Sequence, residues 1–347
     1  VGIEMGIYNR FNLVADYFIN DVDNLVLAVP TPPSAGVPGN SISQNIGTLQ
    51  NRGIEVTLSG NILRRGDFSW DFNANYSKVN NKISSLYQVG GKDVQFIENG
   101  SYNLIRVGDP INIIYGYQSA GVNSVNGNPM FVKADGSLVQ LNLDKTAGTV
   151  GSFYVVNKDN GALGAQSSLA FADKVNLGQG VPTWFGGLSN TFNYKGLGLD
   201  VLLRYSGGNK IMNYTRQEIL SNMSFQNNGR ELLNRWTTPG QVTDVPKLYY
   251  GQGNNINQTS VANSRFVESG DYLRLQNVVL SYAFNNGKLE NWTKGYIKSA
   301  RVYAQGQNLY VWTKYTGADP DNISSLGVDA AVSPQVRTIS FGLSVGF

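Results

Sequence analysis

Apolar and polar residues alternate strictly over residues 338–347, at the end of the chain. One parity is wholly apolar, and the other carries only threonine, serine and glycine. Because a β-strand points successive side chains to opposite faces, the pattern predicts a strand with one apolar face and one small, polar face. A run of about ten residues is also long enough for a tilted strand to cross a bilayer. The apolar residues of this strand are Ile339, Phe341, Leu343, Val345 and Phe347.

A second alternating strand, residues 67–78, carries aspartate and asparagine on its polar parity and large apolar residues on the other. In the core of a soluble sandwich, each of these polar groups would need a partner or cost several kcal/mol. A water-filled lumen accepts them at little cost. The strand therefore favours a barrel wall with lipid on one side and water on the other, with Trp70 and Tyr76 as interface girdle residues.

The same period recurs along the chain and predicts about ten strands joined alternately by short turns and long loops, which is the order of an up-and-down barrel. Proline- and glycine-rich stretches indicate long loops at about 20–44, 80–108, 122–182 and 207–264. Helical stretches are expected within residues 209–237. The predicted strands are 1–8, 11–17, 45–59, 67–78, 111–121, 183–194, 197–206, 265–284, 300–314 and 337–347.

Composition agrees with an exported β-protein. Of the 347 residues, 15% are charged, well below the roughly 25% usual for soluble domains, and 40 are glycine. No window approaches the 18 or so consecutive apolar residues of a transmembrane helix. The net charge of +3 is too small to indicate nucleic-acid binding. Cysteine is absent, which mildly favours an exported protein.

The sequence predicts no enzyme, no cofactor and no metal site. Histidine is absent, which excludes imidazole metal ligands and any Ser-His or Cys-His catalytic pair. Asp67 and Asp71 are most simply lumen-lining residues, and Asp319 and Asp321 most simply cap a turn. Arg274 is expected to pair with a lumen carboxylate.

Four residues in the long loop at 207–264 are candidates for contact with a substrate or a partner. Aromatic side chains with a polar edge stack on sugar faces and contact peptides at wet sites. The alternative is that these residues pack the loop onto its neighbours or onto the girdle. The candidates are Arg235, Trp236, Tyr249 and Tyr250.

Several short motifs, in one consistent order, resemble the SusC/RagA-like TonB-dependent outer-membrane transporters of Bacteroidota. Each motif alone is weak, but their order over the whole chain is hard to obtain by chance. The segments that carry the resemblance are 45–55, 67–75, 107–110, 180–187, 235–240, 269–278, 308–320 and 337–347.

The resemblance implies an all-β fold, the C-terminal half of such a transporter, with these strands forming part of a 22-stranded barrel. No signal peptide opens the sequence, so we expect the plug domain, the TonB box and the earlier strands to lie outside this chain. The implied activity is outer-membrane import of oligosaccharides or peptides, energised through TonB. The implied partners are a SusD-like surface lipoprotein that acts as a lid, outer-membrane lipid, and a second transporter–lipoprotein pair in a dimer. Loops would be extracellular and the C-terminus periplasmic.

Two other readings stay open from the residues alone. A small porin of about ten strands would form a passive pore. A secreted β-sandwich, acting as an adhesin or a carbohydrate-binding module, would show the same period of two. Two stacked sheets with Phe68, Trp70 and Phe341 buried between them would identify the sandwich.

Overall fold

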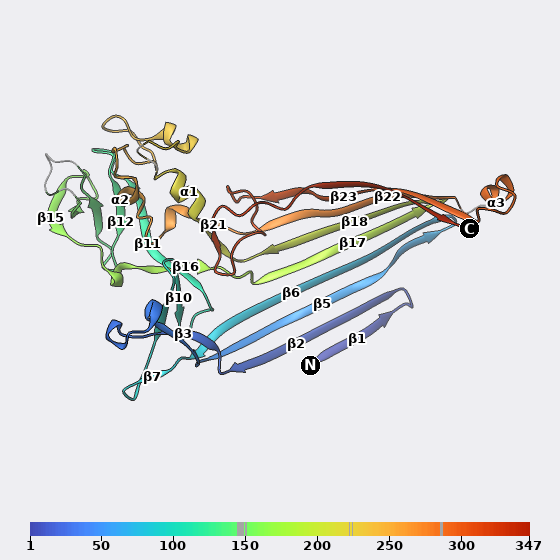
Figure 1. Ribbon diagram of the computed structural model, residues 1–347, viewed down its shortest axis with the longest axis horizontal. Coiled ribbons are helices and arrows are strands. Elements are labelled where there is room, and N and C mark those ends of the chain that lie inside the picture. The colour runs from blue at the N-terminus through green and yellow to red at the C-terminus, as the bar shows by residue number, and fades with distance from the viewer. Residues whose placement is uncertain (144–148, 150, 222, 224, 285–286) are drawn as a thin grey trace.

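The computed structural model describes residues 1–143, 149, 151–221, 223, 225–284 and 287–347. It has two parts, a long sheet and a cap of short strands and helices at one end of that sheet (Figure 1). None of the helices formed by these residues is long and apolar enough to cross a membrane.

The long sheet has nine strands, and each strand pairs in antiparallel fashion with its neighbours in chain order. This is the predicted up-and-down topology, with nine wall strands where about ten were expected. The strands are β1 (Gly2–Ile7), β2 (Phe11–Asp23), β5 (Thr48–Arg65), β6 (Phe68–Ser85), β17 (Trp184–Tyr194), β18 (Leu197–Gly207), β22 (Tyr272–Phe284), β23 (Ser299–Thr313) and β25 (Thr338–Gly346).

The strand predicted at 111–121 does form, as β11 (Ile113–Val122), but the prediction that it belongs to the wall is wrong. It pairs within the cap, with β10 (Asn103–Arg106), β12 (Pro129–Val132), β16 (Val175–Gln179) and β20 (Ala262–Asn263). Ile113 and Ile114 are adjacent and both fully buried, so protein covers both faces of the strand. A wall strand would present one of these faces to water.

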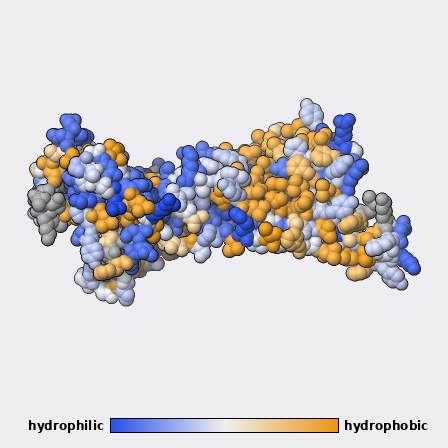
Figure 2. All heavy atoms as spheres, turned by 90° about the horizontal axis from the view of Figure 1, so that it is seen from above, coloured by the Kyte–Doolittle hydropathy of each residue, from blue (hydrophilic) through white to orange (hydrophobic). Residues whose placement is uncertain are grey.

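The register aligns the apolar parities of neighbouring strands into continuous rows. Figure 2 shows hydrophobic residues gathered over the strand part of the molecule, whereas the cap surface is mixed. Phe341 is 80% exposed, so the sheet has no second sheet stacked on this face, and the β-sandwich alternative is wrong. One such row crosses eight strands through Met5, Leu13, Leu58, Ala74, Leu188, Leu203, Leu275 and Tyr310.

A pair of bulges keeps these rows continuous where the sequence changes parity. In β22, Arg274 belongs to the polar face, yet Leu280 shares its parity and lies in an apolar row. The register shifts at Gln276 against both neighbouring strands, and the extra residue moves the following side chains to the other face. Opposite it in β23, Asn308 has φ 51°, and the two amide side chains are joined by a hydrogen bond of 2.8 Å.

Short turns and long connections lie at opposite ends of the sheet (Figure 1). The sequence Asn285-Asn286-Gly287 also predicts a turn after the strand at 265–284, and Asn285 and Asn286 fall outside the described residues. At the other end, the connections span residues 24–47, 86–183, 208–271 and 314–337. Strands β2 and β6 run to Asp23 and Ser85, further than the sequence predicted.

The two longest connections fold together as the cap. Its sheet runs in the order β15-β14-β13-β12-β11-β10-β9. Its buried core takes Ile114 and Leu141 from the first connection and Leu220, Val245 and Phe266 from the second. The remaining cap strands in this sheet are β9 (Phe96–Asn99), β13 (Leu138–Leu141), β14 (Phe153–Val156) and β15 (Leu163–Ser167).

Smaller elements join the cap to the long sheet. A three-stranded sheet has the order β21-β19-β24 and so brings the connection at 314–337 against the cap. The helical stretches predicted within 209–237 form as short helices on either side of residue 227. These elements are β19 (Lys210–Asn213), β21 (Val267–Ser269), β24 (Val328–Asp329), α1 (Tyr214–Ile219), α2 (Gly253–Asn257) and the 3-10 helix η4 (Arg230–Asn234). Two hairpins, β3 (Val26–Pro30)–β4 (Ser41–Asn45) and β7 (Gln88–Val89)–β8 (Lys92–Asp93), lie in the connections at 24–47 and 86–183. The helix α3 (Lys288–Trp292) lies at the opposite, turn end of the sheet.

The apolar face can be tested with two adjacent residues of β25 that point to opposite sides. In the full-length protein folded in lipid vesicles, we expect Phe341→Arg to lower the free energy of unfolding by about 2–4 kcal/mol. Ser340→Arg, on the polar face, should change it by less than about 1 kcal/mol. Chemical unfolding followed by fluorescence measures both, and equal effects would contradict a lipid-facing apolar side.

Candidate functional site

A buried arginine fixes the connection at 314–337 to the polar face of the long sheet. Arg274, on β22, is 1% exposed, and its guanidinium lies 2.5 Å from the Asp319 carboxylate. Its cross-strand neighbour Arg204 lies 3.0 Å from Asp321. The predicted pairing of Arg274 with a carboxylate is therefore confirmed, and the partner comes from a loop that folds down against the wall.

The same two carboxylates also accept hydrogen bonds from neutral donors. The Tyr272 hydroxyl donates to Asp321 at 2.7 Å, and the Gln335 side chain donates to it at 2.8 Å. The backbone N–H of Asp321 donates to Asp319 at 3.0 Å, which is the predicted turn-capping role. Two carboxylates thus balance two guanidinium groups, and removing one partner would leave a buried charge uncompensated.

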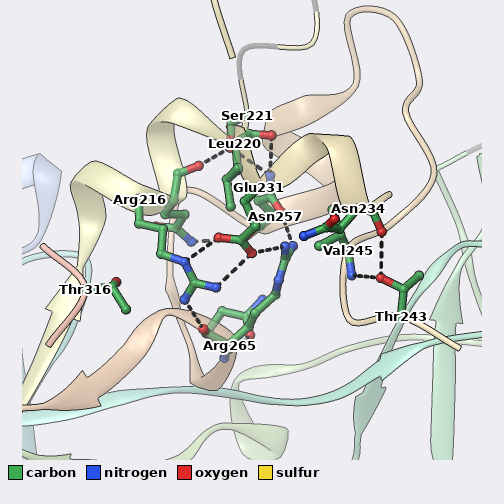
Figure 3. A network of polar contacts seen from close by, with 12 residues as sticks. Arg216, Leu220, Ser221, Glu231, Asn234, Thr243, Val245, Asn257, Arg265 and Thr316 are labelled. Atoms are coloured by element: carbon green, nitrogen blue, oxygen red, sulfur yellow. Dashed lines mark hydrogen bonds and ion pairs between the residues drawn. The ribbon is translucent and has the colours of Figure 1, made fainter. Parts of the chain in front are cut away.

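A second ionic network holds the cap together (Figure 3). Arg216 of α1 binds Glu231 of η4 with two parallel hydrogen bonds, of 2.7 and 2.8 Å. Arg265 donates to the same carboxylate at 3.0 Å and to the Asn257 side chain at 3.0 Å. Glu268 lies 3.4 Å from Arg216 on its other side. The network joins α1, η4, α2 and the segment leading into β21.

Burial and the neighbouring charges act in opposite directions on the pKa values of Glu231 and Arg265. Burial alone would raise the pKa of Glu231, but the guanidinium groups of Arg216 and Arg265 outweigh it, and the pKa is lowered. Burial lowers the pKa of Arg265, with Glu231 opposing that shift. The carboxylate is therefore ionised in the folded cap, and its charge is committed to the two arginines.

A cleft of about 790 Å³ lies beside this network, between α1 and the start of the connection at 314–337. Glu268 spans it, accepting hydrogen bonds from the backbone N–H and the hydroxyl of Thr316, each at 2.8 Å. Hydroxyl, amide and methyl groups make up most of the other walls. The cleft is lined by Asn213, Thr215, Arg216, Ile219, Glu231, Glu268, Ser269, Lys314, Thr316, Gly317 and Ala318.

The four predicted contact residues lie in the cap but not on one surface. Trp236 is 6% exposed, and its indole N–H donates to the Ser124 carbonyl at 2.9 Å. Tyr249 is half-buried against the cap core, and Lys247 lies over the rings of both residues. Arg235 is half-buried and donates to the Leu232 carbonyl at 3.3 Å. Contact with a substrate or a lid stays a prediction for all four.

Tyr250 differs from the other three because its side chain is 67% exposed. Its ring meets that of Phe225, which is 93% exposed, at a centroid distance of 5.9 Å and an angle of 85°. Sequence reasoning identified Tyr250 but missed Phe225. It also missed the whole Arg216–Glu231–Arg265 network, because these residues come from separate irregular segments whose spacing carries no signal.

Comparison with known proteins gives a consistent result over the whole chain. No protein-family model matches it. The TonB-dependent receptor P3 of Formosa agariphila is 28% identical over 365 residues, and SusC of Bacteroides thetaiotaomicron, a TonB-dependent receptor, is 27% identical over 362 residues. Each match covers 100% of this chain and, respectively, 33% and 31% of the relative.

Solved structures agree with the sequence matches. The RagAB peptide importer in its closed-closed state superposes with a TM-score of 0.79 and 25% identity, covering 100% of this chain and 35% of that one. A second structure of the RagAB peptide transporter gives a TM-score of 0.76 at 24% identity, covering 98% of this chain and 34% of that one. The chain thus spans about a third of the length of the relatives it matches. In sequence and in fold, the chain is similar over its whole length to the C-terminal part of TonB-dependent receptors such as SusC and of the RagAB importer.

Proposed function

We propose that the chain forms part of the wall and the extracellular cap of an outer-membrane importer of oligomeric nutrients, either oligosaccharides or peptides. The importer would take up substrate through a plugged barrel, with energy supplied through TonB. This part of the protein would capture and enclose substrate, and the plug domain would lie in the segment that precedes it. We propose no catalytic step, cofactor or metal ion.

One observation carries this proposal. A sheet whose apolar rows are exposed on one face continues directly into a folded cap at one end only. Long extracellular loops and short periplasmic turns are typical of bacterial outer-membrane barrels. The cap would therefore lie outside the cell, with Phe347 and the short turns at the periplasmic side. The sequence relatives, all TonB-dependent receptors, support the same assignment.

The partners of this proposal follow from the similarity to SusC and to RagAB. A SusD-like lipoprotein would close over the cap as a lid, with two transporter–lipoprotein pairs forming a dimer. A passive porin is the weaker alternative. The relatives' names favour energised import over a passive pore.

Energised import and passive diffusion give different results in cells. With the full-length protein expressed, uptake of a fluorescent oligosaccharide or peptide pool should stop when the proton-motive force is dissipated or TonB is deleted. Cells without the gene provide the background. Uptake that continues unchanged after both treatments would identify a passive pore.

Tyr250 is the best single residue for testing capture by the cap, because its exposed side chain can change without disturbing the core. Tyr250→Ala should weaken binding of the lid lipoprotein or of substrate by about tenfold, as truncation of an aromatic contact residue commonly does. Co-purification and titration of the full-length complex measure this. Val89→Ala, on the separate β7–β8 hairpin and 61% exposed, is the control and should have no effect. If the two variants bind equally well, Tyr250 is not part of the contact surface.

The cap must hold its shape to act as a receptor, and Glu231 supplies part of that rigidity. Glu231→Gln would leave two largely buried guanidinium groups without their carboxylate and should destabilise the cap by about 3 kcal/mol. Hydrogen exchange of peptides that span η4 measures this. Asp67→Asn, which removes an exposed ion pair of 3.8 Å to Lys195, should cost less than about 0.5 kcal/mol.

Because the pKa of Glu231 is lowered, the stability of the cap should depend on pH. A carboxyl group with a lowered folded-state pKa stabilises the fold fully above its unfolded value of about 4.3. That stabilisation disappears as the pH falls through the folded-state pKa. Exchange protection of the cap, corrected for the intrinsic rate, should therefore be constant near neutral pH and fall in acid. Glu231→Gln should flatten that part of the profile, and an unchanged acid profile would contradict the assignment.

A further inference from the structure

One connection at the turn end of the sheet does not follow the pattern of the others. The connections β1–β2, β5–β6 and β17–β18 are tight, for example Lys195–Gly196 between β17 and β18. The connection from β22 to β23 instead includes α3 and extends past the strand ends, beyond the C-terminus (Figure 1). We call its described residues, 287–298, the foot.

The foot is held in one shape by its own hydrogen bonds. The Thr293 hydroxyl donates to the Leu289 carbonyl at 2.8 Å and accepts from the Ile297 backbone N–H at 3.0 Å. The Gly295 N–H donates to the Glu290 carbonyl at 2.8 Å, and Gly295 has φ 83°, where glycine avoids strain. This segment is therefore a small folded unit with defined outward-facing side chains.

That folded unit leaves two large aromatic side chains unpacked. Trp292 is 83% exposed and Tyr296 is 78% exposed. Beside them, at the ends of neighbouring strands, lie the C-terminal Phe347, 82% exposed, and the outward pair Tyr282 and Phe284, whose ring centroids are 4.8 Å apart. The foot thus adds two exposed aromatic side chains at the end of the sheet where Tyr282, Phe284 and Phe347 are also exposed.

The foot is also basic. Its sequence has Lys288, Lys294 and Lys298 against Glu290 alone, a net charge of +2. Lys294 and Lys298 are exposed. Tryptophan and tyrosine concentrate at the level of lipid headgroups, where an amphipathic ring meets both hydrocarbon and water. Lysines beside them reach the phosphate groups, and anionic lipids strengthen that attraction.

We propose that the foot is a lipid-binding anchor, seated in the phospholipid headgroup layer on the periplasmic side of the membrane. Trp292 and Tyr296 enter the interface, and Lys294 and Lys298 contact headgroup phosphates. The proposal rests on the membrane-spanning function proposed above, because the apolar face must itself be in lipid for the foot to reach the headgroups. It goes beyond that function by assigning an anionic-lipid contact to a single turn.

The test uses the full-length protein in vesicles of phosphatidylethanolamine and phosphatidylglycerol brominated close to the headgroup, because bromine quenches tryptophan at contact. The emission of Trp292 is obtained by subtracting the fluorescence of the Trp292→Phe variant from that of the native protein. Most of this difference should be lost in brominated vesicles. Trp312, on the outward face near the cap end, is the matched control through Trp312→Phe.

The two tryptophans separate the two proposals. If Trp312 is quenched and Trp292 is not, the barrel is in lipid but the foot is not, and the anchor is overturned. If neither is quenched, the membrane-spanning function itself fails. The double variant Lys294→Gln and Lys298→Gln should remove the dependence of Trp292 quenching on the phosphatidylglycerol fraction. A dependence that survives in this variant overturns the role of the lysines.

Discussion

The whole structure depends on the cross-strand register of the long sheet. Side chains alternate between faces along every strand, so slipping one strand by a single residue would move all of its apolar side chains to the wet side. The row from Met5 to Tyr310 exists only because each antiparallel pairing places apolar opposite apolar. The facing irregularities at Gln276 and Asn308 preserve this order where the sequence changes parity.

The cap is stabilised by a different principle. The wall has one face for apolar surroundings and one for water, whereas the cap buries both faces of strands such as β11 around a conventional core. Polar contacts contribute to the junction between the two parts. Arg274 clamps the connection at 314–337 to the wall, and the Tyr315 hydroxyl donates to Asp329 in β24, which pairs with β19 of the cap. Loop, wall and cap are thereby held in one arrangement.

The sequence predicted the wall well because a period of two is a local signal that each strand carries by itself. It failed at 111–121, where Ile113 to Val122 show a similar local pattern but pair with segments far along the chain, and the adjacent Ile113 and Ile114 are both buried. The ionic network of the cap had no local signal at all, since Arg216, Glu231 and Arg265 meet only through tertiary folding. The pairing of Arg274 was predictable from its charge and not from parity, since Arg274 shares its parity with Leu280 of the apolar row.

Most of the charged residues of the cleft are already in ion pairs, and this limits how the cleft could bind a charged ligand. Arg216, Glu231 and Glu268 line the cleft, yet each is already paired within the protein, so a charged ligand would have to displace an existing partner. Lys314 is the one charged lining residue without an ion pair among the described residues. The side chains of Asn213, Thr215 and Thr316 in the cleft are likewise hydrogen-bonded within the protein, and Tyr250 and Phe225 are exposed elsewhere on the cap. A ligand in this cleft would therefore be bound mainly by shape and by contact with the apolar parts of the walls.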